Sequence, residues 1–545
     1  MSAKDTSSGG FGRPPETGEG GAQAAEAPPA ATKTLAADTP LTGTQLGITA
    51  LALALGTFMQ VLDSTIANVS LPTISGNLGV SSDQGTWVIT AFAVANGIGV
   101  PLTGWLMGRY GVVRTFCVSV LAFTAASFLC GVAWSLPSLI FFRVLQGGVS
   151  GPMIPGSQAL LISIFPPNKR GTALGIWSIT TLVAPICGPI LGGYISDNYH
   201  WGWIFLINVP VGILVTVLAW VNLKDRETPT RKLPIDTVGL VLLIVWVGSL
   251  QVMLDQGKDL DWFSSNEIVI LTIVTALGFV SFLIWELTEK NPIVDLSLFK
   301  RRNFALGTLA FCLGYALFFA GNLLMPLWLQ TQVGYTATWA GLVAAPAGLI
   351  AVLLTPTAAK MLSRIDARIV ATVAFFAFGI SFLMRTNFTA DASFLDFTLP
   401  LLVQGVGLAT FFLAMITILL DGIPPEKIPL ASGLSNFTRI TAGGFAASIV
   451  TTIWDRREAL HQSRITDQTT IFTPGLSQTV TSLHHFGLSA LSADAAVART
   501  VTSQAYLMAA NDIFWASGWI YLVLVGIVWL CKRAYSSGAA HAAAD

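Results

Sequence analysis

Apolar stretches long enough to cross a membrane recur along almost the whole chain, and no other feature constrains its fold as strongly. A helix of about 20 apolar residues spans the hydrocarbon core of a bilayer. Fourteen such windows follow one another, at 47–71, 85–107, 112–133, 138–163, 172–195, 203–222, 235–255, 268–287, 304–328, 337–359, 368–384, 396–420, 429–452 and 510–531. Within lipid each backbone polar group needs an internal partner, so every window should be a helix. The sequence therefore predicts an all-α polytopic membrane protein.

The composition agrees with a chain whose solvent is mostly lipid. Charged residues make up 11% of the chain, whereas a soluble domain carries about 25%. The 29 basic and 29 acidic residues balance, so there is no excess positive charge for nucleic acid. The five cysteines lie in apolar stretches without paired spacing, and we interpret them as core residues. These numbers exclude a soluble enzyme, a nucleic-acid-binding protein and a disulfide scaffold, and no metal site is expected.

The windows fall into two sets that look like copies of one unit. The segment Val144–Gly147 recurs as Leu402–Gly405, and Leu55-Gly56 recurs as Leu313-Gly314, both about 258 residues later. Two six-helix halves around a central site are the architecture of an alternating-access transporter. We therefore predict a disordered N-terminal tail at 1–45, a six-helix bundle at 46–223, two inserted helices at 224–303, a second six-helix bundle at 304–533 and a C-terminal tail at 534–545.

The loops differ in charge on the two sides of the predicted membrane. With the N-terminus inside, the inner loops and the tail hold 18 Lys and Arg residues, and the outer loops hold six. The excess of basic residues on one side predicts that both chain ends are cytoplasmic. One predicted outer loop, 454–509, is polar and unusually long. Its two interpretations are a solvated linker and a docking surface for an extracytoplasmic partner.

Asp63 is the most informative single residue, because it lies inside the first apolar window. Burial disfavours the charged form of a carboxyl group, so such a residue needs a partner, a cavity or a proton. We interpret Asp63 as a proton-coupling residue. The alternative is a structural carboxylate whose partners are neighbours such as Ser64, Thr65 or Asn68.

Two arginines lie inside other windows. Arg143, Gln146 and Gly147 share one helical face, and Arg143 would stabilise ionised Asp63 if that face met the first helix. The alternative is an arginine that extends to the interface from a helix end. Arg439 is the other cation well inside a window, and it would either bind a substrate anion or lock the two halves.

The fifth window combines prolines and glycines at helical spacing. Pro185 and Pro189 share one face, and so do Gly188 and Gly192, which Gly193 follows. Prolines weaken a helix and glycines allow close approach of a neighbour. The pattern predicts a kinked, closely packed helix, and the alternative is an ordinary packing seam.

Together these motifs resemble the major facilitator superfamily and, within it, the fourteen-helix drug:proton antiporter branch. The segment Leu62–Pro72 is similar to the branch's first-helix signature, and Arg143–Gly147 is similar to the R-x-x-Q-G motif assigned to proton transfer. The segment Pro185–Gly193 resembles the antiporter motif that marks exporters.

The segment from Gly104 to Arg114 resembles the family's inner-loop motif with one departure. Gly108 stands where the family has an aspartate, while Arg109 and Arg114 are present. The departure leaves in doubt the charge-based locking that the family assigns to this loop.

The resemblance covers nearly all of residues 45–533 and implies a proton-driven exporter of hydrophobic compounds in a bacterial inner membrane. It implies no cofactor besides the proton gradient. Its implied partners are a periplasmic adaptor and an outer-membrane channel, which together with the chain would form a tripartite pump.

The substrate pocket is expected between the halves. Its hypothetical lining consists of polar or aromatic residues of central helices, namely Asn68, Asn96, Tyr315, Phe318, Phe319, Asn322, Phe412 and Arg439. For each, core packing or contact with lipid is the alternative. Two other functions stay open, a proton-coupled importer of small solutes and a membrane receptor or scaffold that uses 454–509.

Overall fold

The computed structural model describes residues 41–534 apart from 81, 167–168, 231–233, 258–259, 290–291, 390, 425–426, 469–473 and 486–488. All regular secondary structure in these residues is helical. The predicted tails at 1–45 and 534–545 lie almost entirely outside the described residues.

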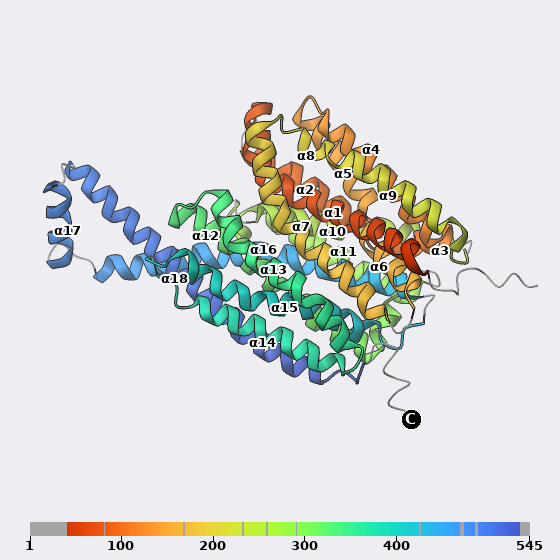
Figure 1. Cartoon of the computed structure of the whole chain (residues 1–545). Coiled ribbons are helices and arrows are strands. Elements are labelled where there is room, and N and C mark those ends of the chain that lie inside the picture. Colours follow the sequence, from red (N-terminus) through yellow and green to blue (C-terminus); the bar gives the residue numbers. More distant parts are fainter. Residues whose placement is uncertain are drawn as a thin grey trace, which may run out of the picture.

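We group the helices into a first bundle, an inserted pair and a second bundle (Figure 1). The first bundle contains α1 (Gly43–Leu78), α2 (Ser82–Gly99), α3 (Thr103–Tyr110), α4 (Val112–Gly131), α5 (Leu136–Ser150), α6 (Met153–Ile164), α7 (Arg170–Asn198), α8 (Trp203–Leu206) and α9 (Asn208–Leu223). The inserted pair is α10 (Thr237–Gln256) and α11 (Asn266–Thr288). The second bundle contains α12 (Arg302–Trp328), α13 (Ala337–Leu362), α14 (Ala367–Arg385), α15 (Phe394–Leu420), α16 (Ile428–Gln468), α17 (Pro474–His485) and α18 (Ala490–Trp529). Short connecting helices are η3 (Lys224–Arg226), η4 (Trp262–Ser264), η5 (Leu296–Lys300) and the π-helix η6 (Leu329–Val333).

Each of the fourteen apolar windows is helical, but fewer helices meet a strict test for crossing a membrane. Eleven are long and apolar enough on their own among the described residues, and twelve if α2 and α3, bent by 54° at their junction, count as one span. The window 138–163 is divided between α5 and α6, and the window 429–452 is only part of the long helix α16. Fourteen crossings therefore stay a prediction.

The two bundles repeat the same packing pattern. In the first, α1 packs on α7 and α9, α2 packs on α5, and α4 packs on α5 and α9. In the second, α12 packs on α16 and α18, α13 packs on α15, and α14 packs on α15 and α18. Corresponding windows thus have corresponding neighbours, as an internal duplication predicts. The inserted helices α10 and α11 pack on each other, and α10 also contacts α2 and α16.

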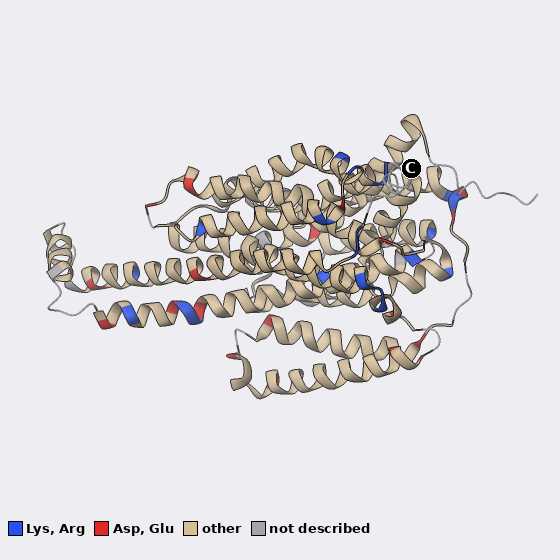
Figure 2. Cartoon of the chain, turned by 90° about the horizontal axis from the view of Figure 1, so that it is seen from below, with Lys and Arg blue, Asp and Glu red and all other residues tan. Residues whose placement is uncertain are grey.

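The bundles meet mainly through α7 with α13 and through α16 with the short segments α3 and α6. Leu430 of α16 lies so close to Gly104 of α3 that a Cβ at Gly104 would come within 3.0 Å of its Cδ1. The contacts of α16 with α3 and α6 lie towards the end of the molecule where both described chain ends are found (Figure 1). Figure 2 shows that most Lys and Arg residues gather at that end as well.

The segment predicted as a polar outer loop, 454–509, is largely helical, so the prediction of a loop is wrong. It consists of the C-terminal part of α16, the short helix α17 and the N-terminal part of α18. These parts extend beyond the bundles in Figure 1. At 1.5 Å per residue, the 41 residues of α16 are about 60 Å long, roughly twice the hydrocarbon thickness of a bilayer. We call this part the helical extension.

The base of the helical extension holds α16 and α18 together by polar and aromatic contacts. Trp454 packs on Tyr506 with ring centroids 4.7 Å apart, and its indole nitrogen donates to the Tyr506 carbonyl at 3.0 Å. Asp512 pairs with Arg457 and lies 2.7 Å from His461 Nε2. The extension is thus continuous with the packed bundle.

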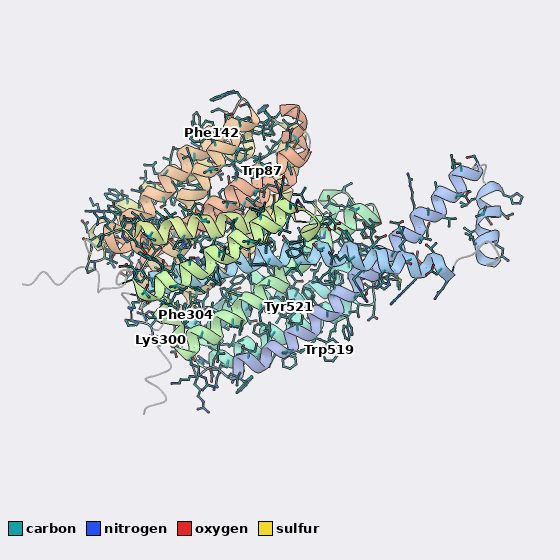
Figure 3. The ribbon with its side chains drawn as sticks, turned by 180° about the vertical axis from the view of Figure 1, so that it is seen from behind. Trp87, Phe142, Lys300, Phe304, Trp519 and Tyr521 are labelled. Atoms are coloured by element: carbon teal, nitrogen blue, oxygen red, sulfur yellow. The ribbon has the colours of Figure 1, made fainter. Side chains whose placement is uncertain are left out.

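Large apolar side chains cover the outside of the bundles, as expected for contact with lipid. Examples are Leu277, Leu353 and Val523, each at least 63% exposed. Tyr521, in contrast, is buried inside the second bundle, where its hydroxyl donates to the Gly314 carbonyl at 3.0 Å. Figure 3 shows Tyr521 among the helices of this bundle and the half-exposed Trp519 beside it on α18.

Adjacent glycines of α5 provide a matched test of this packing. A Cβ at Gly147 would lie 2.4 Å from the Phe92 carbonyl oxygen on α2, whereas a Cβ at Gly148 would meet nothing within 4 Å. Gly147→Ala should lower the free energy of unfolding by about 1–3 kcal/mol because backbone must move. Gly148→Ala should raise it by up to about 1 kcal/mol. Thermal unfolding of the purified variants measures both, and equal shifts would contradict the packing.

Candidate functional site

A buried hydrogen-bonded ion pair lies at the centre of the first bundle. Asp63 is on α1 and Arg143 is on α5, and both side chains are at most 1% exposed. Arg143 Nη1 donates to Asp63 Oδ2 at 2.6 Å. The other carboxylate oxygen accepts from Gln146 Nε2 at 3.0 Å and from Asn208 Nδ2 at 2.8 Å. The structure therefore brings together Asp63, Arg143 and Gln146, as the helix-face argument predicts.

Arg143 is held by more than its carboxylate. Its Nε donates to the Val88 carbonyl at 3.0 Å, and its guanidinium lies 4.2 Å from the ring centre of Phe92 and 5.4 Å from that of Phe205. Aromatic faces attract a cation, especially where water is excluded. Arg143 thus faces the bundle interior, and the alternative that it extends to the interface is wrong.

Two members of this network, Asn208 and Ser127, were not predicted from the sequence. Asn208 Nδ2 also contacts Ser127 Oγ at 3.0 Å, and Ser127 Oγ donates to the Phe205 carbonyl at 2.9 Å. An asparagine inside an apolar window is itself a signal, since an amide in lipid needs partners. Its partner, however, comes from a helix 145 residues away in sequence, which no local pattern reveals.

Two of the neighbours proposed as alternative partners of Asp63, Ser64 and Thr65, donate to the backbone of their own helix. Ser64 Oγ donates to the Val61 carbonyl at 2.8 Å, and Thr65 Oγ1 donates to the Val61 and Leu62 carbonyls. The side chain of Asn68 lies outside the described residues. Among the described residues, the hydrogen bonds to the carboxylate come from α5 and α9.

The arrangement suits a proton exchange site. The ionised carboxylate is paired and accepts three hydrogen bonds, which offsets much of the cost of burying its charge. Protonation of Asp63 would cancel the charge that holds Arg143 and leave a buried cation without its counter-ion. The energetic cost of that state links the protonation of Asp63 to the packing of α1, α5 and α9.

Two glycines of the fifth window, Gly188 and Gly192, pack against α1 close to Asp63 in sequence. A Cβ at Gly188 would lie 2.2 Å from Thr65 Oγ1, and one at Gly192 would lie 3.0 Å from the Ile66 carbonyl oxygen. Gly193 faces open space. The motif of α7 thus fixes the distance to α1 within a turn of Asp63.

The prolines of the same motif do not interrupt the helix. The α-helix α7 continues from Arg170 to Asn198 through Pro185 and Pro189. Pro185 is exposed, and the side chain of Pro189 lies outside the described residues.

The inner-loop motif lies where the bundles meet. Gly104 contacts Leu430 of the second bundle, whereas Gly108 faces open space. Arg109 lies 5.7 Å from the ring centre of Trp105. Because residue 108 is a glycine, this position contributes no carboxylate to the contact between the bundles.

A carboxylate from elsewhere reaches the same loop. Glu227 accepts from the backbone nitrogens of Val113 at 3.0 Å and Arg114 at 2.8 Å, at the start of α4. A carboxylate at a helix N-terminus is stabilising because the first N–H groups have no partner within the helix. Glu227, which follows the first bundle, thus anchors this loop.

A second polar group lies in the centre of the molecule, on α16. Arg439 is 5% exposed, and its guanidinium lies 4.5 Å from the ring centre of Tyr315 and 6.0 Å from that of Phe412. Phe412 packs edge-on against Trp177 of α7, with ring centroids 6.2 Å apart. Three predicted lining residues, Tyr315, Phe412 and Arg439, thus come together where the two bundles meet.

The other predicted lining residues take different positions. Phe319 stacks on Tyr315 at 6.0 Å, and Phe318 packs between Tyr315 and Phe378. Asn96 donates to Ser150 Oγ at 2.6 Å inside the first bundle, because two buried polar groups pair across α2 and α5.

Asn322 does not belong to the central group. Its side chain is exposed and donates to the Phe318 carbonyl of its own helix at 2.8 Å.

Arg385 is one of the six cations counted above in the predicted outer loops, and the structure corrects this, because its side chain is buried at the end of α14. It ends α14, is 1% exposed, and donates to Ser381 Oγ and to Gln404 Oε1. Gln404 is the counterpart of Gln146 in the repeat, yet Gly321 stands at the position that corresponds to Asp63. Among the described residues, Arg385 forms no ion pair. The fully buried pair of Asp63 and Arg143 therefore has no counterpart at Arg385 in the second bundle.

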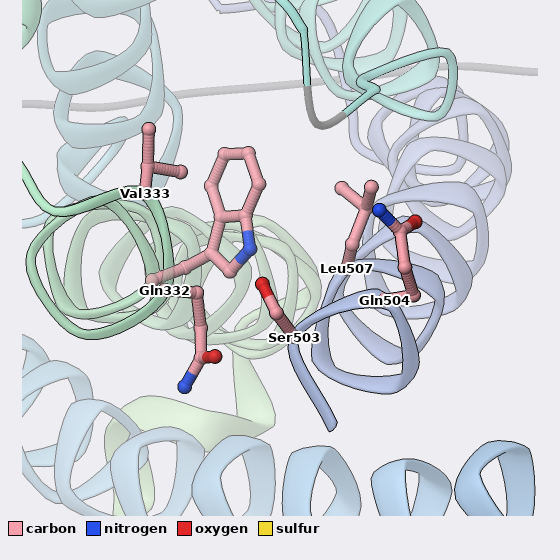
Figure 4. A pocket seen from close by; sticks show the side chains of 6 residues that line it. Gln332, Val333, Ser503, Gln504 and Leu507 are labelled. Atoms are coloured by element: carbon pink, nitrogen blue, oxygen red, sulfur yellow. The ribbon is translucent and has the colours of Figure 1, made fainter. Parts of the chain in front are cut away.

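A cavity of about 110 Å³ lies away from these residues, between the end of α12 and α18 (Figure 4). Its lining residues are Trp328, Gln332, Val333, Ser503, Gln504 and Leu507. The part of the chain that the structure describes contains no group of three or more His, Cys, Asp or Glu side chains placed to hold a metal ion.

Comparison with known proteins places the chain among membrane transporters. The sequence pattern of the Major Facilitator Superfamily matches residues 53–448. Multidrug export protein EmrB of Escherichia coli (strain K12) is 51% identical over 500 residues, which cover 92% of this chain and 98% of that protein. Fatty acid resistance protein FarB of Neisseria gonorrhoeae is 48% identical over 499 residues, which cover 92% and 98%.

A solved structure supports the fold independently of close sequence similarity. The proton:xylose symporter XylE, bound to 6-bromo-6-deoxy-D-glucose, aligns with a TM-score of 0.56 at 12% identity and covers 91% of this chain and 98% of that chain. The predicted fold of two related helical bundles is confirmed.

The ion pair can be tested by a double-mutant cycle on the purified protein. Arg143→Gln leaves a buried carboxylate without its counter-ion and should lower the free energy of unfolding by about 3–5 kcal/mol. Adding Asp63→Asn should recover a large part of that loss, because both charges are then gone. Thermal unfolding reports the three variants, and strictly additive losses would show that the two side chains do not interact.

Proposed function

The chain belongs to the Major Facilitator Superfamily, and on this premise we propose that it is a proton-driven exporter of hydrophobic compounds that works by alternating access. A member of this family is a transporter and not an enzyme. The observation that carries the proposal is the buried pair of Asp63 and Arg143. Charged residues inside a membrane span are energetically costly, and where they occur they mark functional sites.

In the proposed mechanism, protonation of Asp63 is coupled to the release of substrate. A proton that arrives from outside neutralises the carboxylate and weakens its bond to Arg143. The packing of α1 on α7, which the close contacts of Gly188 and Gly192 make sensitive to small shifts, then changes with the protonation state. Substrate release outward accompanies protonation, and deprotonation towards the inside restores the pair for the next cycle.

The proposed substrates are hydrophobic compounds, and the names of similar proteins support this class. EmrB is named for multidrug export and FarB for fatty acid resistance. The central group of Tyr315, Phe412 and Arg439 offers aromatic faces beside a cation, which suits an apolar body with a polar or acidic group. The proton gradient drives the cycle, and no cofactor is proposed.

We place the protein in a bacterial inner membrane with both chain ends cytoplasmic. The uneven distribution of Lys and Arg supports this orientation. The helical extension then lies in the periplasm, where it is the proposed contact for an adaptor that leads to an outer-membrane channel. Its length and rigid base favour docking over the alternative of a solvated linker.

Efflux of a fluorescent dye tests the proton coupling. In cells that express the protein, dye efflux should stop on addition of a protonophore, and Asp63→Asn should reduce its rate by at least about 100-fold, because one protonation state is then fixed. Asp421→Asn at the end of α15 is the matched control and should retain efflux. Uphill efflux by Asp63→Asn, or efflux that persists without a proton gradient, would contradict the proposal.

Shortening the helical extension tests docking separately. Replacing residues 458–500 by a short Gly/Ser linker should abolish drug resistance of whole cells, because the adaptor contact is lost. The same variant should retain proton-driven transport in proteoliposomes, since Asp63 and the central group are unchanged. Full resistance of cells that carry the shortened protein would show that the extension does not dock an essential partner.

A further inference from the structure

A chain of three polar side chains connects the two bundles. It runs from Arg439 of the central group to Gln158 of α6, the helix whose last residue, Ile164, accepts a backbone hydrogen bond from Leu41 at the described N-terminal end. Arg439 Nη2 donates to Asn436 Oδ1 at 3.0 Å, and Asn436 Nδ2 donates to Gln158 Oε1 at 3.3 Å. Arg439 and Asn436 are on α16 of the second bundle, and Gln158 is on α6 of the first. The three side chains are at most 5% exposed.

The cation at one end of this chain strengthens the bond at the other end. A positive charge on the oxygen side of an amide polarises the group and makes its N–H a better donor. Arg439 therefore both orients Asn436 and improves its bond to Gln158. A second bond, from Asn436 Nδ2 to the Ser432 carbonyl at 2.9 Å, keeps the amide on its helix.

Two buried donors beside this chain have no acceptor. Arg439 Nε and the indole nitrogen of Trp177 find no hydrogen-bond partner among the described residues. They come from opposite bundles, and both side chains contact Phe412, Trp177 by ring packing and Arg439 by its guanidinium at 6.0 Å. A buried donor without an acceptor costs about 1–3 kcal/mol. An acceptor group that lay between the bundles at Phe412 would remove that cost.

We propose that Arg439, Asn436 and Gln158 form a latch between the bundles and that an acceptor group of the transported substrate opens it by binding Arg439. Trp177 supplies the second donor to the same group from the first bundle. The inference rests on the proposed function, because the ligand is the exported compound.

Substrate and Asn436 compete for the Arg439 guanidinium, and this competition determines how substrate binding affects closure of the interface. When a substrate acceptor holds the guanidinium, Asn436 loses its charged partner and its bond to Gln158 weakens. When the bundles close on the side of the chain ends, Asn436 regains Arg439 and the substrate loses its strongest contact. Binding of substrate and closure of the latch therefore oppose each other, and linkage makes the two effects equal. Closure on the cytoplasmic side would thus lower the affinity for substrate before its outward release.

A disulfide across the same interface measures closure. Thr103 Cβ lies 3.7 Å from the position of a Cβ built on Gly433, within the usual Cβ–Cβ range of about 3.5–4.5 Å for a disulfide. The pair Thr103→Cys and Gly433→Cys is introduced after the five native cysteines are replaced by alanine. The rate of oxidative cross-linking in proteoliposomes then reports how often the interface is closed.

The probe is laurate, a hydrophobic carboxylate, and its methyl ester is the weaker acceptor. Laurate should slow cross-linking by about fivefold or more at saturation, and methyl laurate should slow it less. Asn436→Ala should slow cross-linking without any ligand, and Arg439→Gln should make the rate insensitive to laurate. Asn222→Ala is the matched control, because within the described part of the chain that amide donates to the Leu218 carbonyl of its own helix at 2.8 Å and not to the other bundle, and it should change neither rate.

Several outcomes would overturn the latch. They are an unchanged rate with laurate in the parent protein, a full laurate response in Arg439→Gln, and an unchanged basal rate in Asn436→Ala. If Arg439→Gln does not fold, Arg439→Lys takes its place and should show a reduced response. These outcomes can be distinguished from a failure of the proposed function. If dye efflux is protonophore-sensitive but cross-linking does not respond to laurate, only the latch is contradicted. If cross-linking responds to laurate but efflux is insensitive to the protonophore, only the proton coupling is contradicted.

Discussion

The bond between Asp63 and Arg143 is the interaction on which the rest of the account depends. Two charges are held in the middle of a helix bundle, and lipid surrounds that bundle, so each must satisfy the other. Gln146 and Asn208 donate hydrogen bonds to the second carboxylate oxygen of Asp63, and Phe92 and Phe205 flank the guanidinium of Arg143. Five helices, α1, α2, α5, α8 and α9, thus contribute to one charge pair, and a change in its protonation reaches all of them at once.

Much of this arrangement could be predicted from the sequence, because its signals are periodic or costly. Apolar windows located the helices, and charges inside them marked Asp63, Arg143 and Arg439. The helix-face argument also placed Gln146 beside Arg143. Such predictions succeed because lipid permits few structures and few buried charges, so each exception carries information.

The failures have equally physical reasons. Asn208 and Ser127 were missed because their partners lie on distant helices, and side-chain pairing across helices leaves no local pattern. Arg385 follows an apolar run, so its sequence position suggested a loop, although it is buried against Gln404. Residues 454–509 are polar but helical, because paired helices outside the membrane need no long apolar face. Asn96 and Asn322 were chosen by residue type alone, and packing directs them elsewhere.

The central claim is that Asp63 exchanges its proton as substrate binds, and proton release measures this most directly. Purified protein in weakly buffered detergent solution is mixed with substrate beside a pH indicator. The account predicts release of about one proton per protein in the parent chain and none in Asp63→Asn, since an amide cannot ionise. Equal release from both proteins, or no release from the parent chain at any pH at which it binds substrate, would contradict it.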